Sequence, residues 1–160
     1  MSILSFVSLC AYVLSKLLFG RLWNQQIGFW AAIFVGFSPD LIILSSMLMT
    51  EIFFVFLIAV FLVCFFYNAY KNPKWYFLVG SAFFLALSVL TRGNALFLII
   101  PVLVFFSFKK RWKELLVFST LFIMFMIPWT IRNYSIYGKF RPFNASPGLL
   151  WSGNFPGANG

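Results

Sequence analysis

Few side chains in this sequence can take part in acid–base chemistry. It holds three acidic residues, Asp40, Glu51 and Glu114, and no histidine. Without an imidazole there is no histidine general base, no Ser-His or Cys-His nucleophile and no histidine metal ligand. The two cysteines, Cys10 and Cys64, lie far apart in apolar runs, which predicts small buried side chains. Carboxylate chemistry in this chain therefore depends on the three acids.

The first two acids flank an apolar stretch. Ser38, Pro39 and Asp40 are typical of a helix start, with a capping hydroxyl, a proline and an acid facing the positive end of the helix dipole. If one helix runs unbroken, Asp40 and Glu51 are eleven residues, or about three turns, apart and share a face. Asp40 is then either a capping acid or a binding residue. Glu51 is either an interfacial residue wetted by headgroups or, as we expect, an acid lining an outward-facing cleft.

A single arginine, Arg92, separates two short apolar runs. Snorkelling of the side chain to the membrane interface is one explanation. A guanidinium also grips phosphate through paired hydrogen bonds, and Gly93 permits a tight turn beside it. We expect Arg92 to bind an anion such as a lipid phosphate.

The composition indicates where these residues must sit. Of 160 residues, 62% are hydrophobic and 9% are charged, whereas a soluble domain has roughly 45–50% apolar and about 25% charged residues. The net charge of +9 does not indicate nucleic-acid binding, because the basic residues are scattered between apolar runs. The sequence therefore predicts a polytopic membrane protein.

The apolar runs predict an all-α, transmembrane helical bundle of about six helical segments, since a span needs roughly 20 apolar residues. The expected segments are 1–19, 22–37, 39–67, 75–91, 95–108 and 114–131. Runs shorter than this require local thinning of the bilayer or helices that are only partly inserted. Residues 132–160 are expected to begin an external loop or domain.

Basic residues occupy alternate breaks between the runs. In these breaks, or close to them at the end of the first run, lie Lys16, Arg21, Lys71, Lys74, Lys109, Lys110, Arg111 and Lys113. The positive-inside rule makes them cytoplasmic. Asp40, Glu51, Arg92 and the residues from 132 onward are then expected on the outer face of a cell membrane.

Both ends of the sequence lead us to expect a central fragment of a longer protein. No basic residue precedes the first apolar run, so that run is expected to cross from outside to inside. The last residues are typical of a loop, with glycine, proline and asparagine and no closing element.

Three ordered stretches resemble the GT-C superfamily of integral membrane glycosyltransferases, in particular protein O-mannosyltransferases and the aminoarabinose transferases of lipid A. The stretches are Phe37-Ser-Pro-Asp with Ser46-Met-Leu-Met-Thr-Glu, then Leu90-Thr-Arg-Gly-Asn, then Pro128-Trp-Thr-Ile-Arg-Asn-Tyr with Gly138-Lys-Phe-Arg-Pro and Ser152-Gly-Asn. In order and spacing they are similar to the central helices of that family, over nearly the whole chain.

The resemblance implies transfer of a sugar from a polyprenyl-phosphate donor to a lipid, glycan or protein acceptor outside the membrane. It implies a catalytic role for Glu51. The expected substrate-binding residues are Asp40, Arg92, Arg132 and Asn133. The family's principal acid lies in an external loop before the first helix of this sequence, so we expect this chain alone to be inactive.

Cofactors and other functions stay open at this point. A divalent cation could help to bind the phosphate of the donor. The two acids expected on the outer face, Asp40 and Glu51, make no metal site by themselves without a histidine. A transporter or flippase for lipid-linked sugars would use the same charges without sugar transfer, and would favour internal repeats that the sequence lacks. In a non-catalytic assembly subunit, Glu51 and Arg92 would be partners between helices.

Overall fold

The computed structural model describes residues 3–19, 26–46, 50–70 and 74–138. Within these ranges the chain is all-helical and contains no strand. The helices are α1 (Ile3–Phe19), α2 (Gln26–Gly36), α3 (Pro39–Ser46), α4 (Thr50–Tyr70), α5 (Trp75–Thr91), a 3₁₀ helix η1 (Gly93–Leu98), α6 (Ile99–Phe108) and α7 (Trp112–Tyr137).

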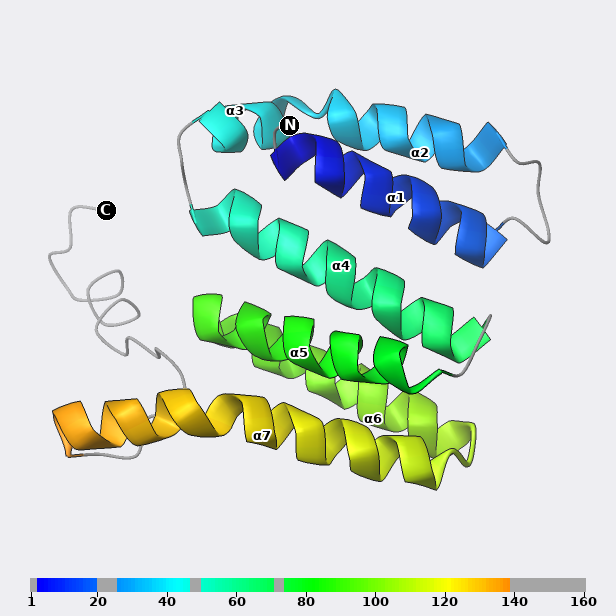
Figure 1. Cartoon of the computed structure of the whole chain (residues 1–160). Helices are drawn as coiled ribbons and strands as arrows, with labels where there is room; N and C mark the ends of the chain where they lie inside the picture. The colour runs from blue at the N-terminus through cyan, green and yellow to red at the C-terminus, as the bar shows by residue number, and fades with distance from the viewer. Residues whose placement is uncertain (1–2, 20–25, 47–49, 71–73, 139–160) are drawn as a thin grey trace, which may run out of the picture.

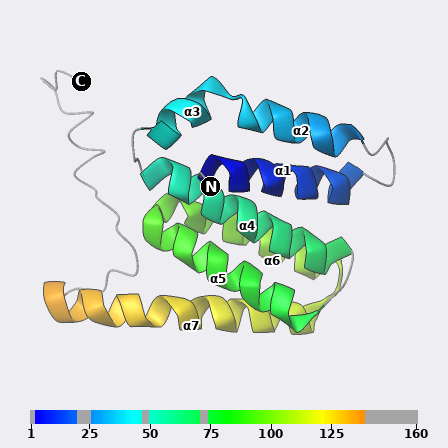
Figure 2. The same ribbon diagram turned by 45° about the horizontal axis from the view of Figure 1, so that its top comes forward.

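The helices are arranged in successive layers (Figures 1 and 2). α2 packs on α1, α1 packs on α4, α4 packs on α5, and α5 packs on α7, while α6 also contacts α7. Because the connections are short, sequential long helices run in alternating directions. The order of the layers thus largely follows the order of the chain.

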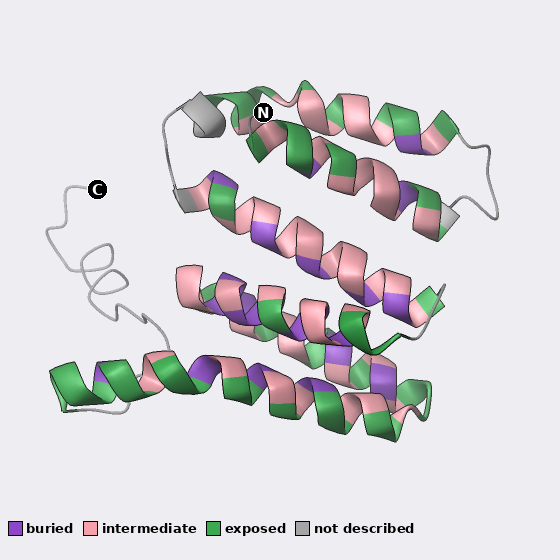
Figure 3. Cartoon of the chain, viewed as in Figure 1, coloured by how far each residue is buried: buried purple, intermediate pink, exposed green. Residues whose placement is uncertain are grey.

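The core lies among α4, α5, α6 and α7. Phe61 and Phe65 of α4, Leu85 of α5, Phe106 of α6 and Phe118 of α7 are buried in one cluster. Figure 3 shows the buried positions on the faces that these helices turn toward one another. Aromatic rings fill the cluster, with the Phe65 and Phe106 rings in an edge-to-face arrangement 5.7 Å apart.

The structure corrects the predicted segment 39–67, which is two helices. α3 ends at Ser46 and α4 begins at Thr50. Serine and threonine favour helix ends, because their hydroxyls compete for backbone hydrogen bonds. The argument that placed Asp40 and Glu51 on one face of a single helix is therefore wrong.

The last helix is longer than the apolar run that predicts it. α7 continues to Tyr137, so Arg132 and Asn133 are helical rather than the start of a loop. Gly138 ends α7 with a φ of 63°, a left-handed conformation that glycine adopts without a Cβ clash. Its N–H donates to the carbonyl of Tyr134 at 2.9 Å.

Among the residues that the structure describes, two helices are long and apolar enough to cross a membrane, judged by length and composition. They are Glu51–Tyr70 and Trp112–Tyr137. Four shorter apolar helical stretches accompany them, at Ile3–Leu18, Gln26–Gly36, Trp75–Thr91 and Gly93–Phe108.

Candidate functional site

The bundle has two chemically different ends. The end that we call the basic end contains Lys16 of α1, Lys74 before α5 and residues 109–113 between α6 and α7. The other end, which we call the acidic end after Asp40 and Glu51, contains the first turns of α3 and α4 and the last turns of α5 and α7 (Figure 1), and it also carries Arg92 and Arg132. Six of the eight basic residues predicted in alternate breaks lie at the basic end, and the other two, Arg21 and Lys71, lie outside the described residues.

An ion pair joins two helices at the acidic end. Glu51 of α4 and Arg92 after α5 are 41 residues apart in the sequence, and Nη2 of Arg92 donates to Oε1 of Glu51. The guanidinium also lies over the ring of Phe54, 5.8 Å from the ring centroid. The structure therefore brings together the two residues from which the sequence predicts charge-based chemistry.

Local backbone structure explains why both side chains are available there. Glu51 lies in the first turn of α4, where the helix dipole favours a negative charge. Arg92 ends α5 with an extended backbone, φ −142° and ψ 117°, and its N–H caps the carbonyl of Ser88 at 2.8 Å. A cation just after a helix C-terminus is likewise favoured by the dipole. The two helix ends thus stabilise opposite charges that then pair.

The pair remains accessible from outside the bundle. The Arg92 side chain is 44% exposed and the Glu51 side chain is 37% exposed. At this exposure an ion pair contributes about 0–1 kcal/mol to stability. An anion can therefore compete with Glu51 for the guanidinium without a large loss of folding free energy.

The other predicted site residues lie at the same end but in different surroundings. Asp40 is exposed in the first turn of α3, consistent with a capping acid. Arg132 is exposed and lies over the indole of Trp129, 4.9 Å from the ring centroid, on its own helix. Asn133 is 1% exposed, so its amide is buried in protein rather than presented to a ligand.

Sequence reasoning missed a polar cluster at the basic end. Asn68 is buried on α4, and its Nδ2 donates to the carbonyl of Lys74 at 3.2 Å. Its Oδ1 accepts from Nη2 of Arg111 at 3.3 Å, and Nε of Arg111 donates to Oε1 of Glu114 at 3.0 Å. A buried amide within an apolar helix was the available signal, because such a group requires partners. This cluster connects α4, the start of α5 and the turn before α7.

Metal binding has little support from the residue arrangement. Over the described ranges, His, Cys, Asp and Glu side chains form no group of three or more that could hold an ion. The Glu51 carboxylate is already paired with a cation. The residues at the acidic end thus do not fit a divalent cation held by this chain.

Comparison with known proteins finds no matching protein family, no matching curated protein and no matching solved structure.

Proposed function

We propose that this chain belongs to a multi-pass membrane glycosyltransferase that moves a sugar from a polyprenyl-phosphate donor to an acceptor at the outer face. The observation that carries the proposal is the accessible Glu51–Arg92 pair. It combines a carboxylate and a guanidinium from two different helices at one end of the bundle. The ordered sequence motifs that contain both residues add the family resemblance.

Exposure of the apolar helices supports the membrane part of the proposal. Only 28% of the apolar stretch of Glu51–Tyr70 is buried inside the protein, and only 17% of the apolar stretch of Trp112–Tyr137. The core helix of a soluble protein would be mostly buried, because water disfavours exposed apolar surface. Lipid contact removes this cost, and a lipid environment favours helices, because each backbone group is then paired within its own segment.

The chemistry of the pair fits transfer from a lipid phosphate. In the transfer step, the acceptor oxygen bonds to the anomeric carbon of the sugar while the bond from that carbon to the donor phosphate oxygen breaks. Arg92 binds the departing phosphate and stabilises its growing negative charge. Glu51 accepts a hydrogen bond or proton from the acceptor hydroxyl. Donor phosphate competes for Arg92, so donor binding releases the carboxylate that the acceptor needs.

A second function rests on the same pair. In a non-catalytic assembly subunit, Glu51 and Arg92 would only hold α4 against α5, the two helices that they join. The two functions differ in whether the position of each charge matters, because a structural ion pair tolerates exchange of its charges and a substrate site does not.

The test measures transfer from a polyprenyl-phosphate sugar by the full-length protein in lipid vesicles, and it measures thermal stability in parallel. Arg92→Ala should reduce donor use by about 10- to 150-fold, as expected for a charge-assisted hydrogen bond of roughly 1.5–3 kcal/mol. Arg92→Lys should retain part of the activity, because the charge survives while the paired geometry is lost. Glu51→Gln should reduce turnover more than it reduces stability.

Two controls separate the functions. Glu114→Gln breaks the Arg111–Glu114 pair at the basic end and should leave transfer unchanged. The double variant Glu51→Arg with Arg92→Glu keeps opposite charges but exchanges their places, so transfer should stay lost. Recovery of transfer in the exchanged variant would support the structural role. Wild-type transfer in both Glu51→Gln and Arg92→Ala would show that the site assignment is wrong.

A further inference from the structure

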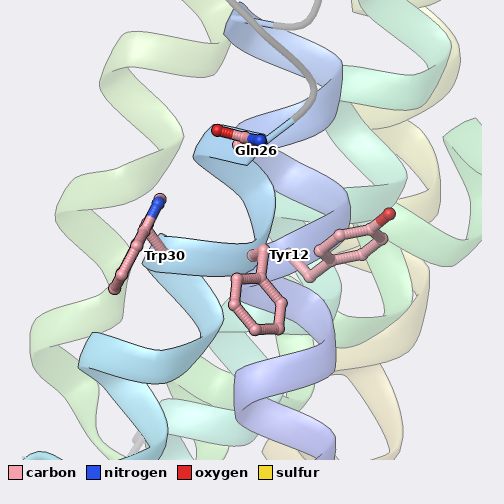
Figure 4. A pocket seen from close by; sticks show the side chains of 4 residues that line it. Tyr12, Gln26 and Trp30 are labelled. Atoms are coloured by element: carbon pink, nitrogen blue, oxygen red, sulfur yellow. The ribbon is translucent and has the colours of Figure 1, made fainter.

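A groove follows the contact between α1 and α2, on the opposite side of α1 from the core. It consists of two adjoining cavities of about 390 and 470 Å³ that share Tyr12 and Phe29 in their walls. The first is lined by Tyr12 of α1 together with Gln26, Phe29 and Trp30 of α2, and Figure 4 shows Tyr12 and Trp30 on opposite sides of α2 in that view. The second continues along α2 to Phe37. The groove therefore extends over most of the length of α2.

The walls of the groove suit a hydrocarbon chain. Phe29, Trp30 and Phe37 are 59%, 56% and 77% exposed, so large apolar rings line the groove without covering it. Ser8 is a polar residue in the wall, but its hydroxyl hydrogen bonds to the carbonyls of Leu4 and Ser5, each at 3.1 Å. A hydroxyl that is satisfied within its own helix does not demand a polar ligand.

The charge at one end of the groove selects an anionic headgroup. Lys16 is exposed in the last turn of α1, and its Nζ lies 5.8 Å from the centroid of the Tyr12 ring that lines both cavities. No acid occurs in the sequence before Asp40. This end of the groove thus carries positive charge without a nearby acid in the sequence to compensate it.

We propose that the α1–α2 groove binds one anionic glycerophospholipid from the leaflet at the basic end. The headgroup phosphate contacts Lys16, and one acyl chain lies along Tyr12, Phe29 and Trp30 toward Phe37. Anionic lipids gather in the cytoplasmic leaflet, and each nearby lysine attracts them. This site is separate from the Glu51–Arg92 pair, and the inference rests on the membrane placement in the proposed function.

The experiment uses phosphatidylglycerol with a diazirine in the middle of one acyl chain, incorporated into vesicles that contain the purified protein. After irradiation, labelled peptides are identified by mass spectrometry. Labelling should concentrate on residues 4–12 and 26–37 and should be displaced by unlabelled phosphatidylglycerol but not by phosphatidylcholine. Lys16→Ala should lower this labelling roughly fivefold, since one lysine near the surface attracts anionic lipid by about that factor. Lys16→Arg should preserve it.

The matched control is Lys109→Ala, which removes an exposed lysine from the same end of the bundle but away from the groove. It should leave groove labelling unchanged. The proposal fails if labelling is spread evenly over all apolar helices, or if phosphatidylcholine displaces the label as well as phosphatidylglycerol does. It also fails if Lys16→Ala and Lys109→Ala change the groove labelling to the same extent. It also fails if the photoreaction yields protein dimers cross-linked through α2, which would identify a second copy as the occupant. If an impermeant reagent instead labelled cysteines at both ends of the bundle from outside intact cells, the membrane placement itself would be rejected.

Discussion

At the scale of single residues, the two polar clusters differ in burial and therefore in what they can do. The Glu51–Arg92 pair is open to its surroundings, which suits exchange of partners with a substrate. Asn68 is 3% exposed and uses both ends of its amide, with Lys74 on one side and Arg111 on the other. A group buried in this way stabilises the fold, because losing it leaves its partners without their hydrogen bonds.

This difference predicts that Asn68→Ala lowers the free energy of unfolding by about 1–3 kcal/mol, the usual cost of unsatisfied buried partners. Asn94→Ala is the matched control, since Asn94 is exposed beside the acidic end, and it should change stability by less than about 0.5 kcal/mol. Thermal unfolding of the detergent-purified protein compares the two variants. Equal effects would mean that the Asn68 amide does not stabilise the contact between the helices.

At the scale of helices, small residues determine how closely α2 approaches α1. Gly28, Ala32 and Gly36 recur at four-residue spacing, a pattern that allows close helix packing in membranes. A Cβ on Gly28 would lie 3.2 Å from the backbone oxygen of Tyr12 and 3.0 Å from its ring. A Cβ on Gly36 would meet Ser8 at 3.7 Å, an ordinary contact. The two glycines are thus not equivalent, although both face α1.

Gly28→Ala is therefore expected to destabilise the α1–α2 pair by about 1–3 kcal/mol, because a backbone oxygen cannot move aside as a side chain can. Gly36→Ala should be neutral or stabilise the protein by up to about 1 kcal/mol through its higher helix propensity. Thermal stability of the two variants, measured side by side in one detergent, provides the test. A loss of stability in Gly36→Ala as large as that in Gly28→Ala would contradict the described packing.

At the scale of the whole molecule, the alternating helices separate the charged residues into two groups. Lys16, Lys74 and residues 109–113 lie at the basic end, whereas Glu51 and Arg92 lie at the other. If the bundle crosses a membrane, the positive-inside rule places the basic end in the cytoplasm. The proposed transfer site then faces outward, where polyprenyl-linked sugars would reach it.

Cysteine labelling tests this orientation. In a background with Cys10→Ala and Cys64→Ala, an impermeant maleimide added outside intact cells should label Asn94→Cys but not Lys110→Cys. Both positions are exposed near helix ends, so accessibility within the protein is matched. Labelling of Lys110→Cys after permeabilisation shows that this cysteine can react. Outside labelling at Lys110→Cys would invert the orientation and move the proposed site to the cytoplasm.

The sequence alone predicted the all-helical class and the bounds of α1 and α5, because long apolar runs between charged breaks determine these features locally. It also predicted Glu51 and Arg92 as the charges to examine, since isolated charges beside apolar runs are costly. Only the tertiary structure decided that these two residues pair, that α3 and α4 are separate helices, and that Asn68 and Arg111 form a second polar cluster. Contacts between residues more than 40 positions apart depend on how the helices pack, and hydrophobic periodicity within one segment carries no information about its partner's register.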